Sequence, residues 1–172
     1  MEQPVAPKPR SGCRRRLLLL AAFAAIVIAA WRVLAVKPFT VPQGARMSPA
    51  LNAGQTAYLD RVSYLIIAPH RGDMAAVAAP ANPLGFVIMR VVAVPGETVE
   101  VKDGALRIDG AAVAESYARG RLPPRMSVGP VRVARGSYFV LPDDRVYAAA
   151  DSRPGPMVRR RDIVARVSPA GR

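Results

Sequence analysis

The chain has 172 residues, of which 25 are Lys or Arg and 12 are Asp or Glu, so its formal net charge is +13. A single cysteine, Cys13, and a single histidine, His70, exclude an internal disulfide and a metal site built from thiols or several imidazoles. The charge alone would suit a nucleic-acid-binding protein, but no helix-turn-helix pattern, aromatic-rich strand pair or zinc-ligand spacing accompanies it. Attraction to anionic lipid headgroups, or simply an arginine-rich proteome, explains the charge better.

The N-terminal segment has the pattern of a membrane anchor. Residues 1–16 form a basic tail, and its three prolines predict disorder over residues 1–12. The apolar segment that follows, Leu17–Val36, would be about 30 Å long as a helix, which matches the hydrocarbon core of a bilayer. Arg32 lies near its end, where a long side chain can reach the interface beside Trp31.

Basic residues set the expected orientation of this anchor. More of them precede the apolar segment than follow it, which predicts a cytoplasmic N-terminus and export of residues 37–172 across the inner membrane. The second interpretation is a cleaved signal peptide with Val33-Leu34-Ala35 as its small-residue cleavage site. The retained anchor is favoured, because the apolar run resumes after Arg32 and leads directly into the next domain.

Residues 37–172 have the pattern of a mostly β domain. Short apolar runs alternate with turn signals such as Asp103-Gly104, a pair that tolerates the positive φ angles of a tight hairpin. Residues Ser116–Pro130, rich in Arg and Pro, predict a long solvated loop, with contact to lipid headgroups or a partner as the alternative. The predicted fold is an antiparallel β-sheet domain on one N-terminal transmembrane helix. Its predicted strands are Phe39–Pro42, Gln55–Leu59, Met74–Ala78, Phe86–Val94, Thr98–Lys102, Ala105–Ile108, Tyr138–Leu141 and Ile163–Val167.

Five segments in chain order resemble motifs of the bacterial type I signal peptidases. VPQGARMSPAL (Val41–Leu51) is similar to the nucleophile loop Pro-x-Gly-Ser-Met-x-Pro-Thr-Leu, and FVIMRVVAVPGE (Phe86–Glu97) to the segment with Lys-Arg-Val-x-x-x-Pro-Gly-Asp. The others are RVSYLIIAPHRGDMAAV (Arg61–Val77), ALRIDGAAV (Ala105–Val113) and GSYFVLPDDRVYAAADSRPGPMVRRRDIVARV (Gly136–Val167). The resemblance implies a mostly β fold whose groove receives an extended peptide as an added strand beside the membrane. It implies no cofactor and no metal.

At the two positions where the resemblance implies catalytic residues, this chain has residues that cannot act as a nucleophile or a base. The resemblance implies a serine nucleophile and a neutral lysine base, but this chain has Arg46 and Met89 there. A guanidinium stays protonated and cannot attack a carbonyl as a hydroxyl does, and a thioether accepts no proton. Gly44 and Ala149 likewise replace two further serines that the resemblance implies.

Two other residues are candidate replacements for the missing groups, Ser48 for the nucleophile and His70 for the base. Ser48 lies two positions beyond Arg46, on the same side of an extended backbone but about 7 Å farther along. His70 could act as a base, but it precedes Arg71-Gly72-Asp73 in a turn, and an exposed histidine without a role is favoured. Arg46 is interpreted either as a surface or core residue without a specific function or as a group that recognises a carbonyl or carboxylate.

The resemblance also implies a peptide-binding set and a bracing set. For Asp143, Asp144 and Asp151, turn-locking ion pairs are favoured over an acid pair. The peptide-binding residues are Gly44, Met47, Pro49, Met89 and Arg90, and the bracing residues are Asp143, Arg145, Asp151 and Arg153.

The favoured function is that of a membrane-anchored signal-peptidase-like protein without peptidase activity. It would bind extended apolar peptides, or assist an active paralogue or surface assembly. The alternatives are an active serine endopeptidase centred on Ser48 that removes signal peptides, and a purely structural exported domain. Membrane lipid and an extended peptide are the expected partners, and nucleic acid is not.

Overall fold

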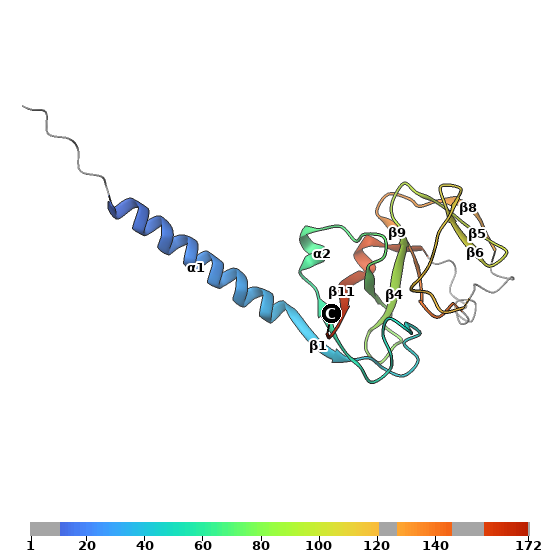
Figure 1. Ribbon diagram of the computed structural model, residues 1–172, viewed down its shortest axis with the longest axis horizontal. Coiled ribbons are helices and arrows are strands. Elements are labelled where there is room, and N and C mark those ends of the chain that lie inside the picture. Colours follow the sequence, from blue (N-terminus) through green and yellow to red (C-terminus); the bar gives the residue numbers. More distant parts are fainter. Residues whose placement is uncertain (1–10, 121–126, 146–156, 172) are drawn as a thin grey trace, which may run out of the picture. The chain divides into compact units, whose positions relative to one another are not determined.

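A computed structural model describes residues 11–120, 127–145 and 157–171 (Figure 1). The chain divides into an N-terminal unit that ends at Ala35 and a β-unit that begins at Val36.

The N-terminal unit contains one helix, α1 (Ser11–Ala35). Leu and Ala, both strong helix formers, dominate its sequence, and it ends shortly before Pro38, which disfavours helix in the residue preceding it. It begins before the predicted apolar segment, so the predicted disorder was wrong for Ser11 and Gly12, which are helical; residues 1–10 lie outside the described part. Within the described residues, no helix is long and apolar enough to cross a membrane.

The larger sheet of the β-unit has seven antiparallel strands in the order β1-β2-β11-β3-β4-β9-β10. Strand β11, from the end of the chain, lies between β2 and β3, and therefore joins the two N-terminal hairpins into one sheet. The strands are β1 (Val36–Thr40), β2 (Thr56–Asp60), β3 (Met74–Ala78), β4 (Phe86–Ala93), β9 (Ser137–Leu141), β10 (Met157–Arg159) and β11 (Ile163–Pro169).

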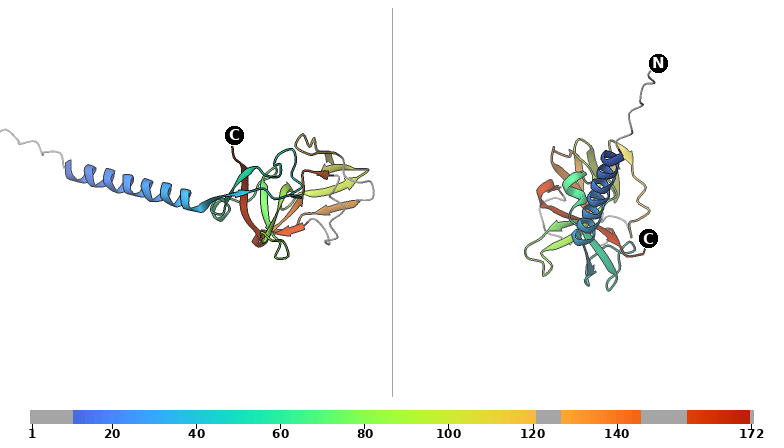
Figure 2. Two further views of the ribbon diagram at one scale, coloured as in Figure 1. Left: turned by 90° about the horizontal axis from the view of Figure 1, so that it is seen from below. Right: turned by 90° about the vertical axis from the view of Figure 1, so that its left-hand side faces the viewer.

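The smaller sheet has four strands in the order β7-β6-β5-β8. They are β5 (Thr98–Lys102), β6 (Ala105–Ile108), β7 (Ala111–Ala112) and β8 (Val128–Arg132). The predicted hairpin is confirmed: Lys102 pairs with Ala105, and the two turn residues Asp103 and Gly104 have φ angles of +53° and +73°. Apart from the short helices α2 (Ser63–Ile66) and η2 (Arg160–Asp162), the described part of the β-unit contains only strands and their connections (Figure 2).

Two apolar clusters cover the two faces of the larger sheet. Ala76 and Ile88 belong to the first, which we call cluster one, together with Met47 and Leu51. The adjacent Ala75 belongs to the second, cluster two, with Tyr64, Val91, Tyr138, Val140 and Ile163. Because successive side chains of a strand point to opposite faces, these clusters lie on opposite sides of the sheet. A third cluster, around Val99 and Phe139, joins the smaller sheet to β4 and β9.

Each of the eight predicted strands overlaps a strand of the structure. Strands β3, β5 and β6 match their predictions to the residue, whereas β1 begins three residues earlier than predicted. The structure adds β7, β8 and β10. Strand β8 corrects the end of the predicted loop Ser116–Pro130, because Val128–Pro130 belong to a strand. It pairs only with β5, and an edge strand tolerates a proline such as Pro130. Most of its side chains are exposed, so its sequence lacks the alternation of apolar and polar residues that would have predicted it.

Substitution of Phe139 tests the packing of the third cluster. Its side chain has 0% exposure, so Phe139→Ala removes a fully buried ring. We expect the free energy of unfolding to fall by about 3–5 kcal/mol, measured by urea titration. The control is Val131→Ala, at a side chain 41% exposed, where a loss of well under 1 kcal/mol is expected. Equal losses in both variants would contradict this packing.

Candidate functional site

The loop Val41–Leu51 forms most of the connection between β1 and β2 and is anchored in the core. Val41, Met47 and Leu51 are at most 1% exposed and belong to cluster one. The N–H of Val41 donates to the carbonyl of Gln55 (2.8 Å), and the N–H of Leu51 donates to that of Met47 (2.8 Å). The loop therefore has a defined shape, set by apolar burial at both ends and in the middle.

Arg46, at the predicted nucleophile position, has a left-handed backbone with a φ angle of +57°. This conformation costs about 1–2 kcal/mol for a residue with a Cβ atom. The carbonyl of Arg46 accepts a hydrogen bond from the N–H of Asp144 (3.0 Å), which holds the backbone in place, and its side chain is exposed. A strained position held by its surroundings is typical of functional loops.

Met89, at the predicted base position, lies on β4 opposite Ala75. Its side chain is half-buried and packs against cluster two. The adjacent Ile88 points to cluster one, where Met47 lies. The two predicted catalytic positions thus differ in environment: Arg46 is exposed to water, and Met89 is packed among apolar side chains.

A buried ion pair connects β4 to the segment after β9. The guanidinium of Arg90 donates to both carboxylate oxygens of Asp143, with the Nε–Oδ1 distance at 2.7 Å, and to the carbonyl of Gly72 (2.6 Å). The guanidinium also lies over the ring of Tyr117, 4.4 Å from its centroid. Arg90 is 8% exposed and Asp143 is 0% exposed, so each charge depends on the other for compensation.

A second ion pair continues this network. Arg145, fully buried, pairs with Glu115, and the hydroxyl of Tyr117 donates to the same carboxylate (3.0 Å). Burial, followed by the charge of Glu115, raises the pKa of Tyr117 to about 12, although Arg145 opposes the rise. The Oδ1 of Asp144 and the Nε and Nη1 of Arg145 are buried and have no hydrogen-bond partner within the described residues. We call Arg90, Glu115, Tyr117, Asp143 and Arg145 the brace.

The structure changes the interpretation of several predicted site residues. Met47 and Arg90 were expected to contact a peptide, but both side chains are buried, Met47 in the core and Arg90 in the brace. Asp143 forms an ion pair with Arg90, which argues against a role for Asp143 in a catalytic acid pair. Asp151, Arg153 and Ala149 lie outside the described residues. Of the remaining residues, Gly44, Pro49 and His70 are exposed and Ser48 is half-buried.

Three members of the network were missed by the sequence analysis: Glu115, Tyr117 and Gly72. Glu115 directly precedes the predicted Arg- and Pro-rich loop Ser116–Pro130 and Tyr117 lies within it, and nothing in the residue spacing indicated that either side chain is directed into the protein. Gly72 contributes only its carbonyl, which leaves no signal in the side-chain pattern. Tyr117 was the one available hint, because aromatic residues are rare in this chain and generally avoid solvated loops.

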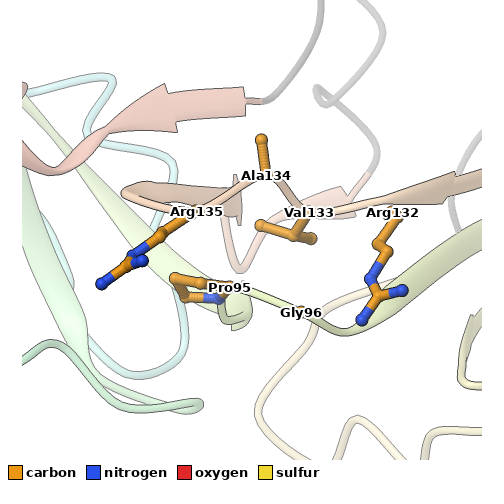
Figure 3. Close-up of a pocket in the computed structure, with 6 residues that line it drawn as sticks. All are labelled: Pro95, Gly96, Arg132, Val133, Ala134 and Arg135. Carbon is orange, nitrogen blue, oxygen red and sulfur yellow. The ribbon is translucent and has the colours of Figure 1, made fainter.

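A separate pocket of about 410 Å³ lies at the turn between β4 and β5. Figure 3 shows the guanidinium groups of Arg132 and Arg135 on the same side of their segment as Pro95 and Gly96. None of the predicted site residues lines this pocket. Within the described part of the chain, no group of three or more His, Cys, Asp or Glu side chains could hold a metal ion.

Comparison with known proteins identifies the family. The family model described as "Signal peptidase, peptidase S26" matches residues 14–170. Signal peptidase I T of Bacillus subtilis (strain 168) is 33% identical over 143 residues, which cover 76% of this chain and 73% of that protein. Signal peptidase I V of the same organism is 28% identical over 169 residues, covering 91% of this chain and 99% of that one. A signal peptidase I structure from Enterococcus faecalis V583 has a TM-score of 0.46 at 28% identity, covering 59% of this chain and 97% of that chain. The match over nearly the whole chain shows that the protein belongs to the signal peptidase, peptidase S26, family.

The ion pair between Arg90 and Asp143 predicts that two aspartates contribute very differently to the free energy of unfolding. Asp143→Ala leaves the buried charge of Arg90 uncompensated, so we expect the free energy of unfolding to fall by about 3–5 kcal/mol. Asp162→Ala is the control, because Asp162 is 45% exposed and lies 3.9 Å from Arg161; a loss below about 1 kcal/mol is expected there. Urea titration measures both, and a small loss for Asp143→Ala would show that the brace is not closed in solution.

Tyr117 predicts a dependence of stability on alkaline pH. Its pKa rises from 10.0 to about 12 on folding, so its contribution is complete below pH 10.0 and is lost as the pH rises towards 12. At neutral pH Tyr117→Phe loses the hydrogen bond to Glu115 and should be the less stable protein. Above pH 10.0 this deficit should shrink, since the variant cannot ionise at this position. Unfolding free energies of both proteins across this range test the prediction, and a constant deficit contradicts it.

Proposed function

We propose that this protein is a membrane-anchored signal-peptidase-like protein that has no peptidase activity and binds extended peptides. One observation supports the loss of activity above all others: the position of the attacking hydroxyl carries the exposed guanidinium of Arg46. A guanidinium is protonated at every physiological pH and cannot form an acyl intermediate. The base position carries the thioether of Met89, which cannot accept the proton.

The preserved scaffold supports a binding role. The loop Val41–Leu51 has a left-handed residue, Arg46, at its centre, and the N–H of Asp144, between Asp143 and Arg145 of the brace, donates to the carbonyl of Arg46. Strands β1 and β10 form the edges of the larger sheet. Edge strands have backbone groups available to pair with an added extended segment, and main-chain pairing needs no catalytic side chain.

We further propose that α1 is the membrane anchor, with the N-terminus in the cytoplasm and the β-unit exported. Its apolar side chains from Leu17 to Trp31 are exposed, Leu18 by 70% and Trp31 by 49%. Arg14, Arg15 and Arg16 precede this apolar stretch and favour the cytoplasmic side.

Cleavage of a purified preprotein tests the loss of activity. The wild-type protein should give no product, whereas Arg46→Ser combined with Met89→Lys should give slow cleavage. The apolar surroundings of residue 89 would lower the pKa of a lysine there and so produce a neutral amine. The rate should remain low because Gly44 supplies no hydroxyl, and loss of one oxyanion donor costs about 10²–10³ in kcat. Product is measured by electrophoresis, and binding of a labelled signal-peptide C-region is measured by fluorescence anisotropy on the same samples.

The outcomes separate the parts of the proposal. Turnover by the wild-type protein would overturn the loss of activity. Failure of both proteins to cleave would leave that part intact and refute the retained site geometry. Absence of peptide binding to either protein would refute the binding role.

A relocated site at Ser48 is the second candidate, because Ser48 is a half-buried hydroxyl in the same loop, two residues beyond Arg46. Labelling of the wild-type protein by a serine-reactive phosphonate, abolished by Ser48→Ala, would support this candidate. Labelling that persists in Ser48→Ala would arise from another serine or from a contaminant.

A further inference from the structure

The pocket beside Pro95 lies at the junction between the two sheets of the β-unit. The chain passes from the larger sheet to the smaller through residues 94–97, between β4 and β5, and returns through residues 133–136, between β8 and β9. The pocket lies where these two connections meet, and we call it the junction pocket. It is lined by Pro95, Gly96, Arg132, Val133, Ala134 and Arg135.

Hydrogen bonds between the two connections fix the backbone of the junction pocket. The N–H of Gly96 donates to the carbonyl of Val133 (2.9 Å), and the N–H of Val133 donates to the carbonyl of Glu97 (2.8 Å). The side chain of Val133 is 1% exposed and packs in the third cluster, which joins the smaller sheet to β4 and β9. The pocket therefore has an apolar floor of defined shape, beside which Pro95 and Ala134 are exposed.

Two guanidinium groups flank this apolar surface. Figure 3 shows those of Arg132 and Arg135 at the two ends of a row in which Pro95 and Gly96 lie between them. Both arginines are exposed. Since they are three residues apart in the chain, their Cα atoms are separated by at most about 11 Å. The junction pocket thus combines two cations with a short apolar surface.

The acidic residues near the junction pocket are placed against other basic residues. The carboxylate of Glu97 forms an ion pair with Arg71, on the turn before β3. Glu100, the next acidic residue along the chain, lies on β5 opposite an arginine of β6. Among the residues that the structure describes, no ion pair involves Arg132 or Arg135. The excess positive charge of the pocket favours an anionic ligand.

The lining of the junction pocket indicates the chemistry of that ligand. Guanidinium groups bind carboxylates through two parallel hydrogen bonds, and the apolar floor favours a ligand with aliphatic groups beside its charges. Asp and Glu side chains have both features, whereas inorganic phosphate has no apolar part. In an extended peptide, side chains two residues apart point to the same side and lie about 7 Å from each other, a separation that two arginines three residues apart can match.

We propose that the junction pocket binds an extended acidic segment of a partner protein. One carboxylate of the segment pairs with Arg132, and a second carboxylate, two residues along, pairs with Arg135. The aliphatic stems of the acidic side chains lie against Pro95 and Ala134. The site is separate from the loop Val41–Leu51, so it does not depend on the function proposed above.

Labelled peptides with blocked termini test the recognition of two carboxylates. Fluorescent Ala-Glu-Val-Glu-Ala is titrated with the full-length protein in a non-ionic detergent, and binding is measured by fluorescence anisotropy. It should bind more tightly than Ala-Gln-Val-Gln-Ala, which has no charge. It should also bind more tightly than Ala-Glu-Glu-Val-Ala, because adjacent side chains of an extended peptide point to opposite sides. Binding should weaken as the salt concentration rises, since the paired charges are exposed.

Charge variants test the two arginines. Arg132→Gln and Arg135→Gln should each weaken binding about fivefold, the upper range for an exposed ion pair, and the double variant about 25-fold. The matched control, Arg61→Gln with Arg161→Gln, removes the same charge from exposed positions outside the pocket and should leave binding unchanged. Urea titration should give the same unfolding midpoint for the two double variants, because all four arginines are exposed.

Photo-crosslinking locates the peptide without any substitution in the protein. Ala-Glu-Val-Glu-Ala with a photoreactive group in place of the valine side chain is irradiated with the wild-type chain, and the cross-linked residues are identified by mass spectrometry. We expect them within residues 94–97 and 132–135.

Four outcomes would overturn the proposal. Equal loss of binding in the two double variants would assign the binding to general attraction by a chain of net charge +13. Equal binding of the two Glu peptides would contradict an extended segment with spaced carboxylates. Displacement of the peptide by an equal concentration of inorganic phosphate would assign the pocket to a free oxyanion. Cross-links outside the two connections would place the peptide elsewhere on the molecule.

Discussion

The ion pair between Arg90 and Asp143 holds the candidate site together. Arg90 lies on β4, and Asp143 follows β9, the strand that pairs with β4. Arg90 also contacts Gly72 and Tyr117, while the residue after Asp143 holds the carbonyl of Arg46. A single buried pair therefore connects the loop Val41–Leu51, the segment around Tyr117 and two strands of the sheet. Moving any one of these parts would expose or separate charges whose burial is tolerable only while they are paired.

On the proposed function, this arrangement explains how the shape of the site persists without its chemistry. The groups that hold the loop are backbone amides, apolar side chains and the brace, and none of them has to donate or accept a proton during a reaction. The left-handed backbone of Arg46 persists because the Asp144 amide fixes its carbonyl, although glycine would adopt that conformation at lower cost. Sequence similarity over nearly the whole chain shows membership in the family, whereas the activity that the resemblance implies would depend on two particular atoms, a hydroxyl oxygen and an amine nitrogen.

The sequence predicted the features that depend on neighbouring residues and missed those that depend on distant ones. Strands β3, β5 and β6 could be predicted because apolar alternation and the Asp103-Gly104 turn are local signals. The burial of Arg90 could not be predicted, because its partner Asp143 is 53 residues away in the chain and arginine side chains ordinarily lie at the surface. Helix α2 has only four residues, too few to show a helical period, and β8 is an edge strand whose side chains are mostly exposed.

At the two predicted catalytic positions, the residues present suit their surroundings. A lysine at residue 89 would have to bury part of a charged or strongly hydrated amine among Tyr64, Ala75 and Val91, whereas Met89 fills the same space without that desolvation cost. Arg46 lies at an exposed position, where a charge costs little. Arg90 and Asp143, by contrast, are both present, and loss of either would leave a buried charge unpaired. On the proposed function, the packed thioether of Met89 and the buried pair of Arg90 and Asp143 together keep the shape of the site without any group that the reaction would need.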